Sequence, residues 1–166
     1  MLRVSKIVDY GTLLLTYMAS SPEQVFSASD LAGILGLGRP IVSKVLKTLG
    51  RHDLVKSTRG PRGGYALARP AKQISIAQVL DALEEQPFGL TECSAVPGAC
   101  SFEAECHIRV NWQHINMLVR HTLEGVSIAD MVRPLPTESP LREHPLRDRN
   151  ASTGVPAQLM TWSYGK

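Results

Sequence analysis

The fold is decided by residues 27–67, which read SASDLAGILGLGRPIVSKVLKTLGRHDLVKSTRGPRGGYAL. The first half of this stretch predicts two short helices joined by a tight turn. Ser27 and Asp30 have the spacing of a capping box, which marks the start of a helix. The run GLG at 36–38 predicts the turn, and Pro40 suits the first position of the next helix because its missing N–H costs little there.

The second of these helices has one apolar face and one basic face. Its predicted inward residues are Val42, Val45, Leu46 and Leu49. Its predicted outward residues are Arg39, Ser43, Lys44, Lys47 and Arg51. Such a pair is typical of a helix-turn-helix, whose second helix enters the DNA major groove, where basic and hydroxyl side chains reach phosphates and base edges. Helix pairs in metabolic enzymes look similar, so the pattern alone leaves that alternative open.

A β-hairpin is predicted directly after the helix pair. Residues 54–57 and 65–67 alternate like short strands, and the connecting run TRGPRGG contains three glycines and a proline. Arg59 and Arg62 would project from its tip. A hairpin in this place is a wing, whose basic tip reaches the DNA backbone or the minor groove. The plainer interpretation is a hairpin with solubilising arginines.

The positive charge is concentrated in the same region. Residues 37–72 hold nine of the 18 basic residues and, of the 15 acidic ones, only Asp53, which leaves a balance of +8. The residues outside this stretch therefore have a negative net charge, although the net charge of the whole chain is +3. A compact basic block predicts binding to a polyanion, with a solvated basic surface as the alternative.

Four parts are expected along the 166 residues. Residues 1–87 predict a compact domain, 88–106 a loop rich in Gly, Pro and Cys, 107–132 a long helix, and 133–166 a disordered tail with several prolines. The fold class is therefore mainly α with a small β-hairpin wing: a winged helix-turn-helix domain plus a long C-terminal dimerisation helix. No run approaches the ~18 apolar residues of a membrane span, and no secretory signal is evident, so a cytoplasmic protein without a membrane partner is expected.

Apolar residues recur at helical spacing in the other helices. The helix expected over 4–20 has a buried stripe of Tyr10, Leu13, Leu14, Tyr17 and Met18. The helix expected after Ser27 has an inner face of Leu31, Ile34 and Leu35. The helix expected after Ser75 has an inner face of Ile76, Val79, Leu80 and Leu83. The stripe of the long helix consists of Ile108, Trp112, Ile115, Val119, Thr122 and Val126. Such a helix packs either across a subunit interface or within the core of its own chain.

Three cysteines lie within fourteen residues: Cys93, Cys100 and Cys106. Thiols along a Gly- and Pro-containing segment are unusual for structural cysteines, and soft thiolates bind iron–sulfur clusters or zinc. The chain has no Cys-x-x-Cys knuckle, which zinc fingers favour, and the wider spacings suit a bulkier cluster. Other donors in or beside the segment are Glu103, Glu105 and His107. Zinc, a thiol switch and inert cysteines remain alternatives.

An enzyme is the competing functional class. Cys106 followed by His107 superficially looks like a thiolate with its base, but catalytic partners meet in space rather than in sequence. The glycine-rich stretch belongs to the wing, and no phosphate-binding loop or metalloenzyme motif is present. The sequence therefore predicts that the chain is not an enzyme. A winged helix that binds only protein, with structural zinc on its thiols, is a third interpretation.

Several motifs occur together in one order. They are RVSKIVDY at 3–10, IVSKVLKTL at 41–49, RGPRGGY at 59–65, and the three-cysteine segment followed by Trp112. With these motifs, which extend over residues 1–132, the chain resembles the IscR/NsrR family of winged-helix transcription regulators. Its N-terminal motif and its cysteine segment are most similar to the branch that regulates the Suf iron–sulfur assembly operon.

The resemblance implies a homodimer on a palindromic operator in double-stranded DNA, with an iron–sulfur cluster, 2Fe–2S or 4Fe–4S, bound by the three cysteines. It also implies two candidates for the fourth ligand. IscR-like members use a His three positions after the last cysteine, but Arg109 stands there in this chain. NsrR-like members use an N-terminal Asp of the other subunit, which Asp9 matches, and His107 is the alternative.

The function that the resemblance implies is a DNA-binding transcriptional regulator, a repressor, that senses an iron–sulfur cluster and controls the genes for cluster assembly. The residues expected at the DNA are Arg39, Ser43, Lys44, Lys47, Arg59 and Arg62. The alternatives are a nitric-oxide-responsive or redox-responsive repressor of the same family, and a zinc or thiol-switch winged-helix protein without a cluster.

Overall fold

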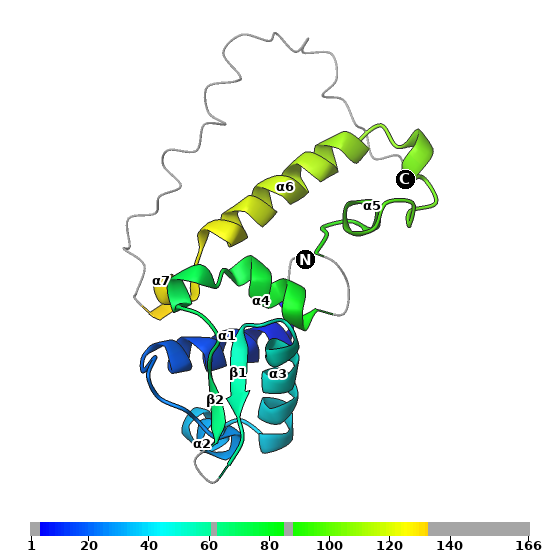
Figure 1. The fold of residues 1–166 in the computed structure, drawn as a ribbon. Coiled ribbons are helices and arrows are strands. Elements are labelled where there is room, and N and C mark those ends of the chain that lie inside the picture. Colours follow the sequence, from blue (N-terminus) through cyan, green and yellow to red (C-terminus); the bar gives the residue numbers. More distant parts are fainter. Residues whose placement is uncertain (1–3, 61–62, 85–87, 133–166) are drawn as a thin grey trace. The chain divides into compact units, whose positions relative to one another are not determined.

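The computed structural model describes residues 4–60, 63–84 and 88–132. Arg62, predicted at the wing tip, and the tail predicted over 133–166 lie outside the described residues. Within the described residues the fold is mainly helical with one two-stranded antiparallel sheet, as predicted (Figure 1). No helix among these residues is long and apolar enough to cross a membrane.

Helix α1 (Lys6–Ala19) buries a face that differs from the predicted stripe. The buried residues are Val8, Gly11, Leu14, Leu15 and Met18. The predicted stripe shares two residues with this face, and its Leu13 is instead 43% exposed. The reason is Gly11, which an apolar pattern passes over because it has no side chain. Gly11 lies against Leu83, and an added Cβ would strike that side chain.

Helices α2 (Ala28–Leu35) and α3 (Arg39–Arg51) form the predicted helix-turn-helix. The capping box is confirmed: Ser27 Oγ accepts a hydrogen bond from the Asp30 N–H at 3.1 Å, and Asp30 Oδ2 accepts one from the Ser27 N–H at 3.2 Å. Gly36 ends α2 with a φ of 64°, a left-handed conformation that glycine adopts without strain. The four predicted inward residues of α3 are all buried.

The inner face of α2 is narrower than predicted. Leu31 is fully buried and Leu35 is half-buried, but Ile34 is 52% exposed. Because Ala32 is buried together with Leu31, the middle of the inner face lies between them, and Ile34 falls about 110° away at about 100° per residue. This short helix therefore leaves a large apolar side chain at the surface.

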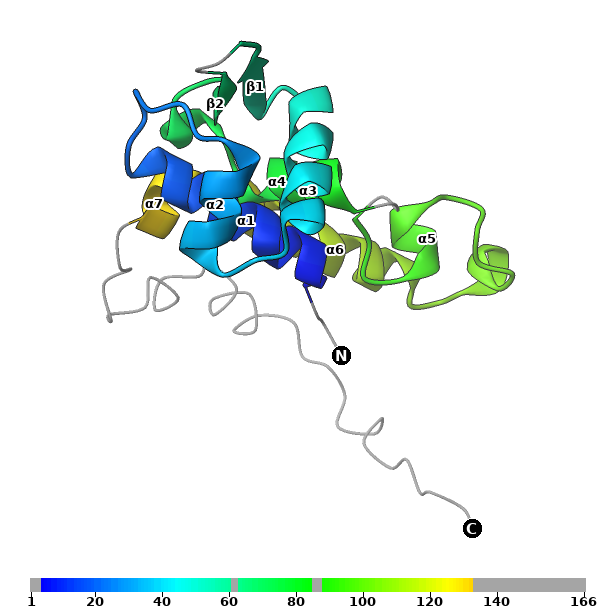
Figure 2. The ribbon, with the colours of Figure 1, turned by 90° about the horizontal axis from the view of Figure 1, so that it is seen from below.

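Strands β1 (Val55–Thr58) and β2 (Gly64–Leu67) pair as an antiparallel hairpin. The hairpin is the predicted wing, and both ribbon views place it beside α3, which β1 contacts (Figures 1 and 2). Phe26 and Tyr65 exchange backbone hydrogen bonds of 2.9 and 2.8 Å, which tie the segment before α2 to β2. The register pairs Val55 with Leu67 and Thr58 with Gly64.

After the hairpin the chain forms a 3-10 turn, η1 (Ala71–Gln73), and helix α4 (Ile76–Leu83). Ser75 is the predicted N-cap of α4, and it forms a reciprocal capping box with Gln78. Three of the four predicted inward residues of α4 are buried and Ile76 is half-buried. Helix α4 packs against both α1 and α3, so it belongs to the same core as the helix-turn-helix.

The remaining described residues depart from the predicted division into a loop and one helix. The loop predicted over 88–106 contains a short helix and a 3-10 turn, and the helix predicted over 107–132 is two helices. These elements are α5 (Glu92–Ala95), η2 (Glu103–Glu105), α6 (Arg109–Gly125) and α7 (Ile128–Val132).

The break between α6 and α7 has a local cause. Ser127 Oγ accepts a hydrogen bond from the Asp130 N–H, and Asp130 Oδ2 accepts one from the Ser127 N–H, so a new helix cap interrupts the apolar spacing. Helix α7 turns back onto α1, where Ile128 is fully buried and its N–H donates to the Ile74 carbonyl at 2.8 Å. The compact domain therefore includes α7.

We expect Leu31→Ala to lower the free energy of unfolding by about 2–5 kcal/mol, because it removes a fully buried side chain from the core. The change Ile34→Ala, on the same helix, should lower it by less than about 1 kcal/mol because that side chain is half exposed. Urea unfolding followed by circular dichroism measures both variants. Equal losses would show that Ile34 belongs to the inner face after all.

Candidate nucleic-acid interface and cysteine segment

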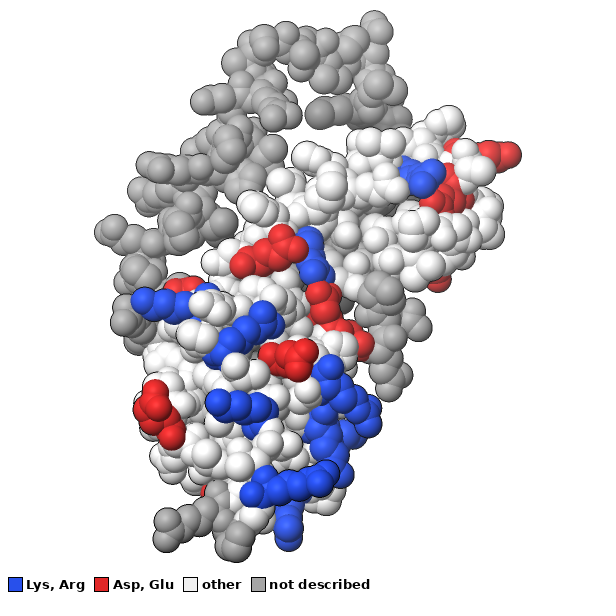
Figure 3. Space-filling view, viewed as in Figure 1, with Lys and Arg blue, Asp and Glu red and all other residues white. Residues whose placement is uncertain are grey.

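Helix α3 presents a basic face to solvent. Arg39, Lys44 and Lys47 are exposed, Ser43 is half-buried among them, and Arg51 is exposed at the end of the helix. The opposite face of α3 is buried in the core, which determines the direction of the basic face. Figure 3 shows Lys and Arg side chains gathered over α3 and the hairpin, while the acidic side chains lie mainly over other elements.

The hairpin extends this basic surface. Arg59 is exposed in the tip between β1 and β2, and Lys56 is exposed on β1. Gly60 has a φ of 122°, so the tip uses a backbone conformation that other residues rarely adopt. Arg62 lies outside the described residues. Lys56 was not among the residues predicted at the DNA, and its only sequence signal was its place in the basic block.

The arrangement of α3 and the hairpin suits a polyanion. The N-cap of α3 is Gly38, which has no side chain with which to cap the first N–H groups at the positive end of the helix dipole. Its basic and hydroxyl side chains share one face, from which they can contact phosphates and base edges in a major groove. The geometry therefore matches a helix that enters a groove with a hairpin at its side.

The cysteine segment, residues 88–106, lies beside α6 and away from the hairpin in both ribbon views (Figures 1 and 2). Cys93 lies on α5 and is only 7% exposed, whereas Cys100 and Cys106 are half-buried. All three cysteines are free thiols. The Thr91 hydroxyl lies 3.4 Å from Cys93 Sγ, so the most buried thiol also has a polar neighbour.

The thiols are not gathered into a metal site. Within residues 4–60, 63–84 and 88–132, no three His, Cys, Asp or Glu side chains lie close enough together to hold a metal ion. The donor chemistry nevertheless fits an iron–sulfur cluster, because three thiols outside disulfides share one segment.

The two candidates for a fourth ligand lie in different places. Asp9 is exposed on α1 and lines an apolar cavity of about 690 Å³, which residues 88–90 at the start of the cysteine segment also line. His107 is exposed directly after Cys106. In the described part of the chain neither belongs to a group of three metal donors. A role for either as a ligand therefore depends on a rearrangement or on a second subunit.

A buried carboxylate connects the turns of the cysteine segment. Glu103 is 9% exposed and is the one buried polar residue in the part of the chain that the structure describes. Its Oε2 accepts a hydrogen bond from the Gly98 N–H at 2.6 Å, and its Oε1 lies 2.7 Å from Nη2 of Arg109. The sequence suggests Glu103 only as a metal donor. No periodic pattern predicts its contacts with Gly98 and Arg109.

Helix α6 is bonded to α4 by an arginine that sequence reasoning missed. The two Nη atoms of Arg120 donate to the two Oδ atoms of Asp81, each at 2.6 Å, and its Nε donates to Glu124 at 2.9 Å. The hydrogen bonds to Asp81, and then those to Glu124, raise the pKa of Arg120 well above its ordinary range. The pair with Glu124 has the i,i+4 spacing of a helix, whereas Asp81 is 39 residues away. A displacement of α6 would therefore act on α4.

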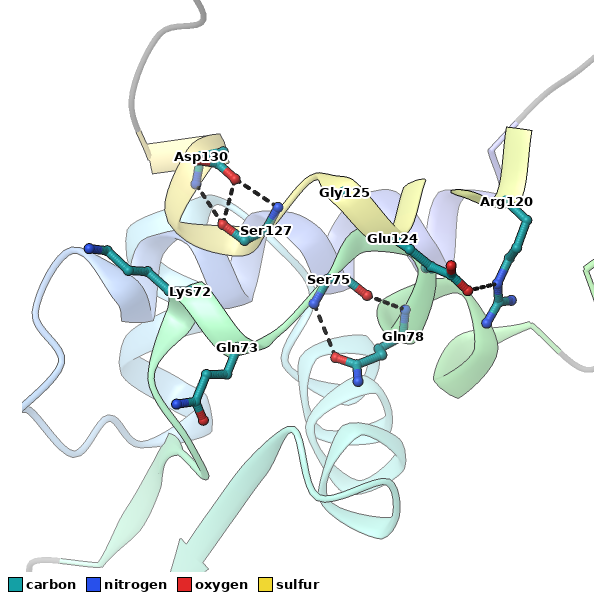
Figure 4. Close-up of a pocket in the computed structure, with 10 residues that line it drawn as sticks. Lys72, Gln73, Ser75, Gln78, Arg120, Glu124, Gly125, Ser127 and Asp130 are labelled. Atoms are coloured by element: carbon teal, nitrogen blue, oxygen red, sulfur yellow. Dashed lines mark hydrogen bonds and ion pairs between the residues drawn. The ribbon is translucent and has the colours of Figure 1, made fainter. Parts of the chain in front are cut away.

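Figure 4 shows the cleft of about 670 Å³ that η1, α4, α6 and α7 line. Its hydrogen bonds are the capping pairs of α4 and α7, and its ion pair joins Arg120 to Glu124. None of the residues predicted at the DNA or at the metal lines it. The cleft therefore lies where the ends of α4, α6 and α7 meet, apart from the predicted functional residues.

Known proteins share the sequence pattern and the fold of this chain. Residues 4–134 match the Rrf2 family, described as an iron-dependent transcriptional regulator. A protein of Aquifex aeolicus (strain VF5), named as an HTH-type transcriptional regulator, is 26% identical over 130 residues, which are 77% of this chain and 90% of that protein.

Two solved structures are similar as well. IscR from T. potens is 26% identical with a TM-score of 0.60, and the match covers 79% of this chain and 86% of that one. CymR, the global cysteine regulator of B. subtilis, is 24% identical with a TM-score of 0.60, and the match covers 80% of this chain and 97% of that one. The likeness to CymR is one of fold.

Proposed function

The chain belongs to the Rrf2 family of transcriptional regulators, and from this premise we propose that it is a homodimeric repressor that senses an iron–sulfur cluster and controls the genes for cluster assembly. As its family implies, it binds DNA and is not an enzyme. The observation that supports the proposal most directly is the set of three free thiols on a segment that packs against α6. Helix α6 is in turn hydrogen-bonded, through Arg120, to α4 of the winged-helix domain. The resemblance to the Suf branch supports the choice of target genes, and the proposed regulator is placed in the cytoplasm.

At the operator, α3 enters the major groove and the hairpin lies along the adjacent backbone or minor groove. The support for this placement is the exposed basic face of α3, which stands opposite the face buried in the core. Positive side chains supply affinity through phosphates, and the hydroxyl and guanidinium groups supply contacts to base edges. The contacting residues are Arg39, Ser43, Lys44, Lys47, Arg59 and Arg62.

The second subunit packs on α6. No residue of α6 is buried within the single chain, although apolar side chains are frequent along it. Five large apolar side chains at its start and along its length are 38–71% exposed. Three of them, Ile108, Trp112 and Ile115, share one face of the helix, and such an apolar surface is typical of a protein interface. The twofold symmetry of a dimer then matches a palindromic operator. These side chains are Ile108, Val110, Trp112, Ile115 and Met117.

The cluster ligands are Cys93, Cys100 and Cys106, with Asp9 of the partner subunit as the fourth ligand and His107 as the alternative. When bound, an iron–sulfur cluster supplies a centre that oxidants can damage or remove. The support is the donor set itself, three free thiols in one segment and an exposed carboxylate on α1. A carboxylate holds iron less firmly than a thiolate holds it in such clusters, and weaker ligation suits a sensor.

A route from the thiols to the DNA runs through described contacts. Helix α5 contacts α6, α6 is bonded through Arg120 to Asp81 of α4, and α4 packs on α3. Gathering the thiols would change the path of the cysteine segment and displace α6 against α4. In the dimer, that displacement would alter the separation of the two α3 helices. The ligand shifts operator affinity only if the two arrangements bind it differently.

Lys47→Ala should weaken operator binding and reduce the slope of log affinity against log salt by about 1, because one phosphate contact is lost. Lys72→Ala is the matched control, since Lys72 lies on η1 rather than on α3 or the hairpin, and it should leave affinity and slope unchanged. Fluorescence anisotropy at several salt concentrations, on an operator selected by the protein from random DNA, measures both. Equal effects of the two substitutions would contradict the placement of α3 at the DNA.

Ile115→Glu should convert the dimer into a monomer, because a carboxylate without a partner is costly in an apolar interface. His121→Glu is the control, since that side chain of the same helix is 90% exposed within the chain. Sedimentation velocity gives the mass of each species. A dimer that persists in the Ile115→Glu variant would show that the subunits meet elsewhere.

Protein purified without oxygen should show broad visible absorption, with iron and sulfide bound in similar amounts, because thiolates at these positions hold a cluster. Cys100→Ala should abolish the absorption. Asp9→Asn should shorten the lifetime of the cluster while His107→Ala should not, and the reverse order would make His107 the fourth ligand. Operator binding with and without the cluster then identifies the repressing form.

Colourless protein that contains zinc, or that takes up no metal after anaerobic reconstitution with iron and sulfide, would contradict cluster sensing. The same thiols would then serve a structural zinc or a thiol switch. A cluster that forms but releases the operator only after treatment with nitric oxide or an oxidant would favour the stress-responsive repressor of the same family.

A further inference from the structure

We propose that Glu103 and Arg109 form a lock on the cysteine segment, which keeps the thiols apart and must open before they can converge on a metal. The lock is defined as the Glu103–Arg109 ion pair together with the hydrogen bond from the Gly98 N–H to Glu103. The proposal rests on the proposed role of the thiols as metal ligands. In it, Glu103 and Arg109 are positioning residues rather than ligands.

The lock joins two parts of the cysteine segment to the first residue of α6, around the last two thiols. Glu103 lies between Cys100 and Cys106 in the chain. Its Oε2 accepts from the Gly98 N–H, before Cys100, at 2.6 Å, and its Oε1 pairs with Nη2 of Arg109, after Cys106, at 2.7 Å. One carboxylate thereby connects the chain before, between and after these thiols.

Backbone hydrogen bonds reinforce the same path. The Glu103 N–H donates to the Cys100 carbonyl at 3.1 Å, and the Arg109 N–H donates to the Cys106 carbonyl at 3.3 Å. In this path the described residues contain no group of three donors that could hold a metal ion. The thiols are therefore not gathered on this path, and the contacts of Glu103 oppose a change of path together with these backbone hydrogen bonds.

The burial of Glu103 favours a closed lock, and the exposure of Arg109 provides a way for it to open. Glu103 is buried, and a buried carboxylate that loses its cation is strongly unfavourable, so its place depends on Arg109. Within the described residues, Nε of Arg109 is buried without a hydrogen-bond acceptor, a cost that is relieved when the side chain moves into water. The Arg109 side chain is already 38% exposed, so it has direct access to solvent.

The test measures thiol modification in the reduced, metal-free, full-length protein. Glu103→Gln keeps the size of the side chain and removes its charge. We expect Cys100 and Cys106 of this variant to react with a chromogenic disulfide reagent about 10- to 100-fold faster than in the unaltered protein, the range set by the usual strength of a hydrogen bond to a charged group. Mass spectrometry assigns the rate to each thiol. Amide hydrogen exchange at Gly98 should accelerate as well.

Four variants separate the lock from a general loss of structure. Glu105→Gln is the matched control, because it removes the same charge from an exposed residue of the same 3-10 turn, and its rates should equal those of the unaltered protein. Arg109→Gln should reproduce the effect of Glu103→Gln, and Arg109→Lys should restore slow labelling in part because it returns a cation. The rate at Cys93, which lies on α5, and the far-ultraviolet circular dichroism should stay unchanged in all four.

Convergence of the thiols is followed with Co²⁺, whose thiolate complexes have characteristic absorption. The Glu103→Gln variant should form these bands faster than the unaltered protein, and Glu105→Gln should not. Unchanged labelling rates in both Glu103→Gln and Arg109→Gln would overturn the lock, whatever Co²⁺ does. Slower cobalt binding by Glu103→Gln would also overturn it. Faster labelling with no cobalt–thiolate bands in any variant would support the lock on the thiols and overturn their role as metal ligands.

Discussion

The close approach of α1 and α4 at Gly11 is the contact on which the rest of the fold depends. Because Gly11 has no side chain, Leu83 can lie against α1, and both helices share one core with α3. The buried face of α3 determines where its basic face points, so the packing of α1 and α4 orients the surface that we propose binds DNA. Helix α1 also receives α7, and thus it holds together the DNA-binding elements and the end of the described chain.

Sequence reasoning succeeded where a structure depends on residues within one turn. The capping boxes at Ser27 and Ser75, the buried face of α3 and the glycine-containing hairpin all have such local signals. It failed where the deciding residue lacks a side chain, or where a local helix cap lies inside an apolar pattern that looks continuous. Gly11 shifted the buried face of α1, and the cap at Ser127 divided a helix whose apolar spacing looked continuous.

The candidate site was predictable in composition but less so in geometry. The three cysteines and the basic block can be found in the sequence, because closely spaced thiols favour metal binding and clustered positive charge favours binding to a polyanion. The bonds of Glu103 to its neighbours, and of Arg120 to α4, join residues that no periodic pattern relates, and only the folded chain reveals them. The cluster ligands themselves remain a prediction from the resemblance, since in the described residues the thiols do not converge.

The chain returns after α6 to the place where α4 begins, and this has a consequence for how such a protein can diversify. Ile128 is hydrogen-bonded to Ile74, and Val126 to Ile76, so the excursion that follows α4 and includes the cysteine segment and α6 ends beside the start of α4. An excursion with both ends fastened can be lengthened, shortened or given a different tip while its base stays unchanged. The architecture is in this sense modular. The same DNA-binding helices and hairpin can be combined with different ligand-binding residues in the excursion, so that a new signal can be sensed without a new fold.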